Sequence, residues 1–241
     1  MDINKEFLEL QKISDEYIKP DPGRIVDKKL LALIVAEIIP IISGPDVLEM
    51  GFGDDQWTSK IIEKIGHTHI VDASTVLLET CKNKYKENVS CYESFFENFE
   101  PEKKFNTIIA SYILEHVEDP VLVLSKAINW LKDDGILIAI VPHAGSLHRR
   151  LAVEMGMQKN VSDLGETDFQ MGHRRVYSLD AFEEDITKSG YKITEKIGLN
   201  LKLLPQKMMT QFSDEMLIGL MKLSKALPIE YASAIAFVCK K

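Results

Sequence analysis

The segment 46–72 restricts the fold of this chain more than any other stretch. It reads DVLEMGFGDDQWTSKIIEKIGHTHIVD, in which a short apolar run ends at Glu49 and a second one ends at Asp72. Between them lie glycines at 51 and 53 and then a helical pattern. Glycine lets the backbone turn sharply and leaves room for a ligand. Because an acid at the end of the second strand can accept hydrogen bonds from ribose hydroxyls, the segment predicts a ribose-binding βαβ unit.

The spacing of the glycines indicates which ligand this unit binds. The dinucleotide pattern needs a third glycine three places after Gly53, where the chain has Gln56. The motif E-x-G-x-G instead resembles the class I S-adenosylmethionine (SAM)-dependent methyltransferases, and the resemblance extends from about residue 25 to the end. Asp55 stands where that family usually has glycine, so it adds an anion near the expected methionine carboxylate. The resemblance implies that SAM is the cofactor, bound in this region by Glu49, Gly51, Gly53, Asp72 and Ala73.

Strands and helices are expected to alternate along the rest of the chain. Apolar runs predict further strands over 89–92, 105–110, 136–141, 191–204 and 231–239, and helical periods lie between most of them. Such alternation predicts an α/β fold with a doubly wound, Rossmann-like sheet. The resemblance to methyltransferases implies seven strands, mostly parallel, with an antiparallel last strand inserted beside the fifth.

The residues at the carboxyl ends of these strands are expected to converge on one crevice, because doubly wound sheets bind their ligands there. The run S-x-x-L-E-H-V-x-D-P over 111–120 closely resembles the fourth-strand motif of the methyltransferases. By that resemblance Ser111 and Tyr112 approach the methionine part of SAM, and residues after the third strand contact adenine. Phenylalanines in such a turn also serve as hydrophobic plugs. The residues implied for adenine are Glu93 or Ser94 at its edge and Phe95 or Phe96 on its face.

Two basic clusters lie in the long connection after the fifth expected strand. They read SLHRR over 146–150 and GHRRVY over 172–177, and both resemble a bacterial branch of these methyltransferases. In an acidic chain they suit an anionic substrate group, such as a carboxylate or a sugar-linked phosphate. Alternatively, the arginines pair with the acidic residues at 154, 163, 166 and 168. The candidate substrate-binding residues are His148, Arg149, Arg174, Arg175 and Tyr177.

Three histidines are candidates for the base that methyl transfer to a hydroxyl requires. His173 lies in the insertion expected to cover the crevice and is the first candidate. His116 belongs to the fourth-strand motif, and His143 ends the fifth strand, where the bacterial branch usually has asparagine. No set of histidine, cysteine and carboxylate residues has the sequence spacing of a metal site, so we expect no metal.

The composition sets limits on partners and location. The chain of 241 residues has a net charge of −8, which argues against a nucleic-acid partner because phosphate neutralisation supplies most of that affinity. The N-terminus lacks a signal-peptide layout, and the most apolar run, 30–42, is too short to span a bilayer. Three widely spaced cysteines suit reduced thiols in a cytoplasmic protein. We expect a single domain over 1–241, with a helical cap over 1–42, a substrate-side insertion over 142–178 and a lid helix over 206–228.

These motifs together predict a SAM-dependent methyltransferase acting on an oxygen, with nitrogen less favoured, of a small molecule or glycan. A ubiquinone-type phenol is one such acceptor, because the O-methyltransferases that act on it have a similar insertion after the fifth strand. Two other functions fit less well. A non-catalytic SAM-binding subunit or sensor would explain Asp55. A nicotinamide oxidoreductase is disfavoured by Gln56 and by the absence of a Tyr-x-x-x-Lys pair.

Overall fold

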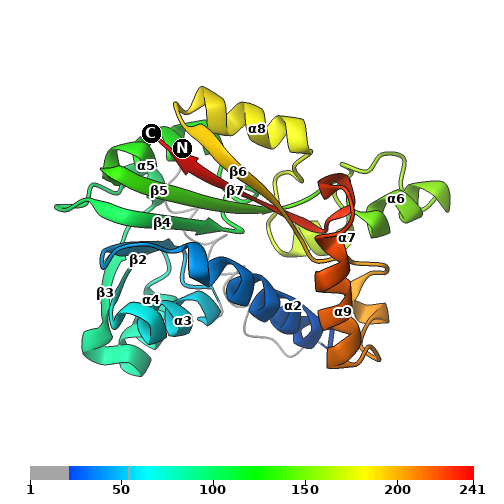
Figure 1. The fold of residues 1–241 in the computed structure, drawn as a ribbon, viewed down its shortest axis with the longest axis horizontal. Helices are drawn as coiled ribbons and strands as arrows, with labels where there is room; N and C mark the ends of the chain where they lie inside the picture. The colour runs from blue at the N-terminus through cyan, green and yellow to red at the C-terminus, as the bar shows by residue number, and fades with distance from the viewer. Residues whose placement is uncertain (1–21, 54) are drawn as a thin grey trace.

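A seven-stranded sheet forms the centre of the protein (Figure 1). The structure is a computed structural model that describes residues 22–53 and 55–241, so the first half of the helical cap expected over 1–42 lies outside the described residues. The strand order is β3-β2-β1-β4-β5-β7-β6, and β7 runs antiparallel to both of its neighbours. The predicted fold, with the last strand beside the fifth, is confirmed. The strands are β1 (Val47–Met50), β2 (Thr68–Asp72), β3 (Val89–Glu93), β4 (Phe105–Ser111), β5 (Leu131–Pro142), β6 (Lys192–Leu199) and β7 (Ala234–Lys240).

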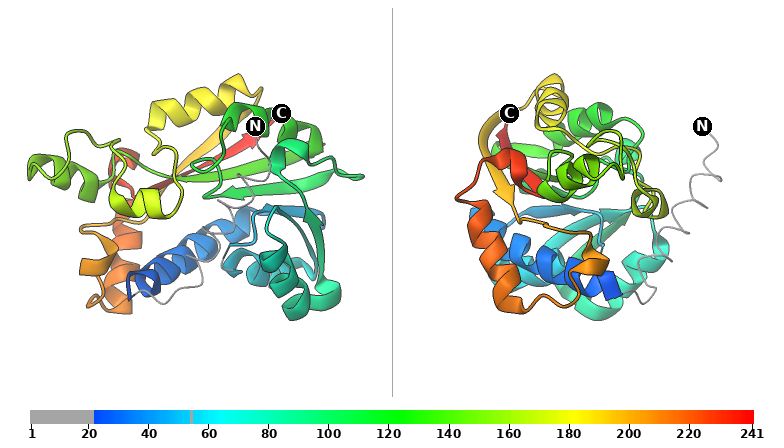
Figure 2. Two further views of the ribbon diagram at one scale, coloured as in Figure 1. Left: turned by 180° about the vertical axis from the view of Figure 1, so that it is seen from behind. Right: turned by 90° about the vertical axis from the view of Figure 1, so that its right-hand side faces the viewer.

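Helices cover both faces of this sheet (Figure 1, Figure 2). On one face lie α2, α3 and α4, and on the other lie α5 and α8, while α6 extends beyond the end of the sheet. Among the described residues, no helix is long and apolar enough to cross a lipid bilayer. The helices are α2 (Pro22–Ile38), α3 (Gln56–Ile65), α4 (Thr75–Tyr85), α5 (Pro120–Trp130), α6 (Leu147–Glu154), α7 (Glu166–Gln170), α8 (Leu179–Lys188) and α9 (Asp214–Ser224).

The central strands β1, β4, β5 and β7 are buried on both faces over most of their length, which explains why they read as largely apolar runs. In β4, Ile108 packs into the cluster that contains residues of α5 and α8. Its neighbour Ile109 packs into the cluster that contains residues of α2 and α3. Alternate side chains of a strand point to opposite faces, so one strand serves both cores. The two cores hold β1 and β4 side by side in parallel register.

Local sequence signals set several helix ends. The hydroxyls of Ser74 and Ser178 accept hydrogen bonds from main-chain N–H groups three residues later, at 3.4 and 3.1 Å, and so begin α4 and α8. Gly66 ends α3 in the left-handed region with φ of 82°. Pro22 is the first residue of α2. Proline is well tolerated at the first position of a helix.

The lid helix expected over 206–228 is wrong in its extent. The stretch contains a short 3-10 turn at Gln206–Met208 and then the separate helix α9. Ser213 causes the break, because its hydroxyl accepts a hydrogen bond from the N–H of Met216 and starts a new helix there. Apolar residues on both sides of the break pack against α2, which gave the whole stretch its helix-like period.

Candidate active site

The carboxyl ends of β1 and β4 meet where the strand order reverses, which is where doubly wound sheets bind ligands. Gly51 follows β1, Asp72 ends β2 and Ser111 ends β4. The N–H of Gly51 donates to the carbonyl of Val71 at 2.8 Å, which holds the turn after β1 against the end of β2. The structure thus brings the predicted cofactor residues to one edge of the sheet.

The turn after β1 has backbone conformations that favour glycine. Gly51 has φ of 79°, and a Cβ added to it would lie 2.7 Å from Cδ1 of Ile113. Gly53 has φ of 53°, and no atom lies within 4 Å of an added Cβ, so the turn adjoins open space. Asp55 has φ of 67°, which gives a physical reason why glycine is usual at this position in the family.

The carboxylate of Asp55 is neutralised within the protein. Lys84 of α4 forms both an ion pair and a hydrogen bond with it. This hydrogen bond raises the pKa of Lys84 above its ordinary value. Because the additional anion has a cationic partner, Asp55 provides no reason to infer that SAM binding is lost.

Asp72 has the contacts and the spare acceptors expected of a ribose-binding carboxylate. Its Oδ2 accepts a hydrogen bond from the N–H of Phe52 at 2.9 Å, and its Oδ1 accepts one from the N–H of Ser74 at 2.7 Å. Burial raises the pKa of this carboxyl, and the main-chain hydrogen bonds oppose the rise. A carboxylate has about four lone pairs, so about two stay available for ribose hydroxyls.

The other acid of this region, Glu49, connects a strand to a helix. It is buried in β1, and its carboxylate accepts a hydrogen bond from the Thr58 hydroxyl of α3 at 2.6 Å. This bond fixes the first turn of α3 above the end of β1. A contact between Glu49 and the amino group of SAM stays a prediction.

The turn after β3 carries the residues expected to contact adenine. Glu93 is exposed and accepts a hydrogen bond from the Thr75 hydroxyl at 2.9 Å. The N–H of Ser94 donates to a carbonyl at the end of β2 at 3.1 Å, so β2 and β3 end together. Phe96 packs against the core, whereas Phe95 lies outside that cluster and is half-buried. Phe95 is therefore better suited than Phe96 to the face of adenine.

The end of β4 has a polar atom without a partner and an unusual backbone conformation. The hydroxyl oxygen of Ser111 is buried and has no hydrogen-bond partner among the described residues. Tyr112 has φ of 57°, which is uncommon for a bulky residue and typical of functional sites. Together with the open turn at Gly53 and the spare acceptors of Asp72, these features fit a bound SAM molecule.

The G-H-R-R segment of the insertion holds the loop that follows β4. The N–H of Arg174 donates to the carbonyl of Glu115 at 2.8 Å, and its Nε donates to that of His116 at 2.9 Å. Both terminal nitrogens of Arg175 donate to further carbonyls of the loop 114–118, at 2.6 to 3.0 Å. Two motifs that are far apart in the sequence therefore form one structural unit beside the cofactor crevice.

This unit brings one glutamate and two histidines together. The rings of His116 and His173 meet edge to face, with centroids 4.8 Å apart, and Glu115 adjoins both. Nδ1 of His173 lies 2.9 Å from Oδ1 of Asp168, so Nε2 is left for another partner. Burial raises the pKa of Glu115 to about 7 and lowers the pKa of His116 to about 4. Groups with such altered pKa values in a crevice are candidates for proton transfer.

Sequence reasoning missed Glu115 and Asp168 as site residues. Both carboxylate oxygens of Glu115 are buried and have no hydrogen-bond partner among the described residues. Glu115 lies inside the motif that resembled the family, so the motif itself contained the signal. From the sequence, Asp168 is expected only as an ion-pair partner for an arginine. Its hydrogen bond with Nδ1 of His173 depends on the fold of the insertion.

The arginines expected to hold an anionic substrate have partners inside the protein. Nη2 of Arg149 donates to Asp168 at 2.7 Å, and its Nη1 donates to the carbonyls at 161 and 163. Arg175 is engaged by the loop 114–118, as is Nε of Arg174. The ion pair of Arg149 with Asp168 agrees with the alternative interpretation. Arg174 and Arg175 instead bond to main-chain carbonyls of the loop 114–118 and not to the expected acidic residues.

Three other candidates are enclosed by the fold. The hydroxyl of Tyr177 donates to Asp185 at 3.0 Å, and its ring packs in the core. Nδ1 of His143 donates to the carbonyl of Ala232 at 3.0 Å, and burial lowers the pKa of this histidine. Both arrangements suit a structural role. His148 differs, because its Nδ1 is buried and has no hydrogen-bond partner among the described residues.

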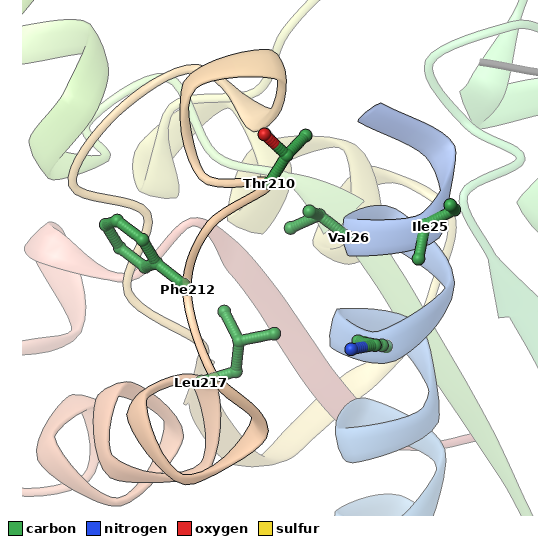
Figure 3. A pocket seen from close by; sticks show the side chains of 6 residues that line it. Ile25, Val26, Thr210, Phe212 and Leu217 are labelled. Carbon is green, nitrogen blue, oxygen red and sulfur yellow. The ribbon is translucent and has the colours of Figure 1, made fainter. Parts of the chain in front are cut away.

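An apolar pocket lies between α2 and the segment that leads into α9 (Figure 3). None of its lining residues belongs to the cofactor crevice or to the group around His173, so it is not part of the predicted site. The lining residues are Ile25, Val26, Lys29, Thr210, Phe212 and Leu217.

Comparison with known proteins gives a family for the chain. Residues 23–196 match the family described as "Methyltransferase domain". A curated relative, (S)-coclaurine N-methyltransferase of Papaver somniferum, is 29% identical over 162 residues, which cover 61% of this chain and 44% of that protein. The chain therefore spans less than half the length of this relative.

Solved structures share the fold at low sequence identity. The N-methyltransferase NodS from Bradyrhizobium japonicum WM9, in complex with S-adenosyl-L-homocysteine, matches with a TM-score of 0.58 and 12% identity over 96% of this chain and 97% of that one. The [4+2]-cyclase SpnF matches with a TM-score of 0.61 and 14% identity over 88% of this chain and 81% of its own. At such identities the likeness shows the fold alone.

The sheet and its crevice define a class I, Rossmann-like methyltransferase fold of the kind that binds SAM. The chain belongs to the methyltransferase domain family, and its cofactor is S-adenosyl-L-methionine. We predict that Asp72 contacts the ribose of this cofactor, Phe95 its adenine and Ser111 its methionine part.

Proposed function

We propose that the protein transfers a methyl group from SAM to a nitrogen or an oxygen of a small molecule. The observation that carries this proposal is the position of the group formed by Glu115, His116 and His173. The first two of these residues lie on the short loop that follows Ser111, the last residue of the strand that ends in the crevice. An acceptor beside this group is therefore next to the expected methionine part of SAM.

The protein's contribution to this reaction is to position the acceptor and to remove its proton. SAM supplies an electrophilic methyl group on a sulfonium. Holding the acceptor atom about 3 Å from the methyl carbon, in line with the sulfur, supplies much of the acceleration. Asp168 accepts a hydrogen bond from Nδ1 of His173, which fixes the tautomer in which Nε2 has a lone pair for the acceptor's proton.

Nitrogen deserves equal weight with oxygen as the acceptor atom. The sequence motifs favoured oxygen, but the Papaver relative is an N-methyltransferase. In addition, the buried and unpartnered carboxylate of Glu115 suits the positive charge of an amine. A methylated amine gains positive charge as the bond to the methyl carbon forms, and a carboxylate nearby stabilises it.

The test is release of S-adenosylhomocysteine from SAM by the purified protein against a panel of amines, phenols and glycans. We expect turnover with an amine or a phenol. In His173→Ala, kcat should fall by about a hundredfold or more, whereas the affinity for SAM should stay within about twofold of the parent protein. His67→Gln is the control, because His67 lies just before β2, at the end of that strand that is far from the crevice. Its ring nitrogens form hydrogen bonds with the carbonyl of Glu87 and the hydroxyl of Ser90. Full activity in His173→Ala would exclude His173 as the base. SAM binding without turnover on any acceptor would favour a non-catalytic subunit.

A further inference from the structure

Glu115, His116 and His173 also have the composition and geometry of a metal site. We propose that these three side chains bind a divalent first-row transition-metal ion such as Zn²⁺. One ligand atom from each residue lies within 4.8 Å of the other two. Two imidazole nitrogens and one carboxylate oxygen are a common ligand set for such ions, with room for a further ligand. The inference rests on this geometry and not on the proposed methyl transfer.

The carboxyl group of Glu115 is buried in surroundings that leave its two oxygens unsatisfied within the described part of the chain. The residue is 0% exposed, and neither of its oxygens has a hydrogen-bond partner among the described residues. Leaving a buried polar group unsatisfied costs free energy, and the cost is higher for a charged group. A cation bound at the group would supply the missing partner.

His173 is oriented as a metal-ligand histidine usually is. Nδ1 of His173 bonds to one oxygen of Asp168 at 2.9 Å, and Arg149 donates to the other oxygen at 2.7 Å. The main chain of Gly172 lies near the ring of His116. In metal sites the second ring nitrogen of a ligand histidine is held by a carboxylate or a carbonyl in this way. Nε2 of His173 is thereby left for the ion.

The geometry and charges indicate which ion fits. Ligand atoms of tetrahedral zinc lie roughly 3.4 Å apart, so the three side chains have to close by up to about 1.4 Å. The positive charges of Arg174 and Arg175 lie near His116 and repel a cation, so a cation that binds only by electrostatic attraction is disfavoured. An ion that bonds to imidazole is therefore favoured over Mg²⁺, which prefers oxygen ligands. Because the ion would take the lone pair that the proposed base needs, Zn²⁺ should inhibit methyl transfer.

The test is titration of the metal-free, full-length protein with Zn²⁺ by calorimetry and with Co²⁺ by visible absorption. We expect one ion per chain and no displacement by excess Mg²⁺. Glu115→Gln and His116→Ala should each weaken Zn²⁺ binding about tenfold or more. Glu115→Gln keeps the shape of a buried side chain, and circular dichroism checks that it folds. His67→Ala is the matched control, because it removes a histidine outside the group, and it should leave the affinity unchanged.

Two results would overturn the metal site. One is Zn²⁺ affinity that Glu115→Gln and His116→Ala leave intact. The other is intense thiolate absorption from bound Co²⁺, which would place the ion at Cys81 and Cys91, two cysteines that contact each other. Both readouts are independent of methyl transfer. Turnover without Zn²⁺ binding counts against the metal site alone, and Zn²⁺ binding without turnover counts against the proposed function alone.

Discussion

Asp55 occupies a backbone conformation that glycine would adopt without strain. Its ion pair with Lys84 offsets part of that strain. Aspartate is among the residues that tolerate the left-handed region, so the turn after β1 keeps its shape without the usual glycine. A departure from the family pattern at one position is thus compensated by a lysine on the next helix.

Replacing Asp55 by glycine should change little. Removing the left-handed strain stabilises the fold by about 1 kcal/mol, and removing a partly exposed ion pair destabilises it by about 0–1 kcal/mol. We expect the free energy of unfolding of Asp55→Gly, measured with urea, to lie within about 1 kcal/mol of the parent. SAM affinity by calorimetry should be similar or better. A large loss of SAM affinity would show that Asp55 itself contacts the cofactor.

Asp72 is the residue on which SAM binding should depend most directly. Asp72→Ala leaves two ribose hydroxyls without acceptors, so we expect SAM binding to weaken by about 1–3 kcal/mol in calorimetry. Asp133→Ala is the control, because Asp133 is an exposed carboxylate near the start of β5, at the opposite end of the sheet. Unchanged affinity in Asp72→Ala would show that the ribose lies elsewhere.

At the scale of elements, an ion-pair network fixes the start of β1. Asp46 immediately precedes β1 and pairs with Lys103, which lies before β4, and with Lys132 of β5 at 2.7 Å. The hydrogen bonds with Lys103 and Lys132 lower the pKa of Asp46 to about 2. The network therefore connects the ends of three neighbouring strands opposite the crevice.

This network predicts a particular pH dependence of stability. The pKa of Asp46 is lower in the folded protein than the value of about 3.9 expected when unfolded. Its contribution is therefore complete above about pH 4 and is lost as the pH falls toward 2. We expect Asp46→Asn to lower the free energy of unfolding at pH 7 by about 1–2 kcal/mol, a range that allows for solvent screening of this partly exposed group.

Urea unfolding of Asp46→Asn and the parent at pH 7 and pH 3 measures this effect. The difference between the two proteins should shrink at the lower pH, because the parent carboxylate is then closer to protonation. A difference that is the same at both pH values would show that the ion pairs with Lys103 and Lys132 do not cause the loss.

For the whole molecule, cofactor binding should be visible as stabilisation. A ligand that binds only the folded chain at about 100 times its Kd adds about 2.7 kcal/mol to the free energy of unfolding. For a chain of this size that corresponds to a rise in Tm of about 5–10 °C. We expect this rise with SAM and S-adenosylhomocysteine in differential scanning fluorimetry. A comparable rise with NAD would contradict the assignment of the crevice to SAM.

Much of the fold could be predicted because its signals are local. The glycine turn at Gly51, the capping serines at Ser74 and Ser178 and the apolar strands act over a few residues. The extent of α9 could not be predicted. Apolar residues before and after Ser213 both pack against α2, so they follow a single helical spacing in the sequence although they do not form a single helix. The hydrogen-bond partners of Arg149 and Arg175 could not be predicted either. An arginine can donate to an acidic side chain or to a main-chain carbonyl, and the sequence does not say which of these acceptors the fold brings close.

By itself the sequence determined the class of fold and the crevice, since alternating strands, a glycine bend and Asp72 impose their geometry through short-range sterics and hydrogen bonding. Only the tertiary structure decided what adjoins that crevice. It brought His173 from the insertion against Glu115 and His116, and it turned two arginines from substrate candidates into supports for the loop between them. Such contacts join segments that are distant in the chain, and they form only when the sheet has set both segments in place.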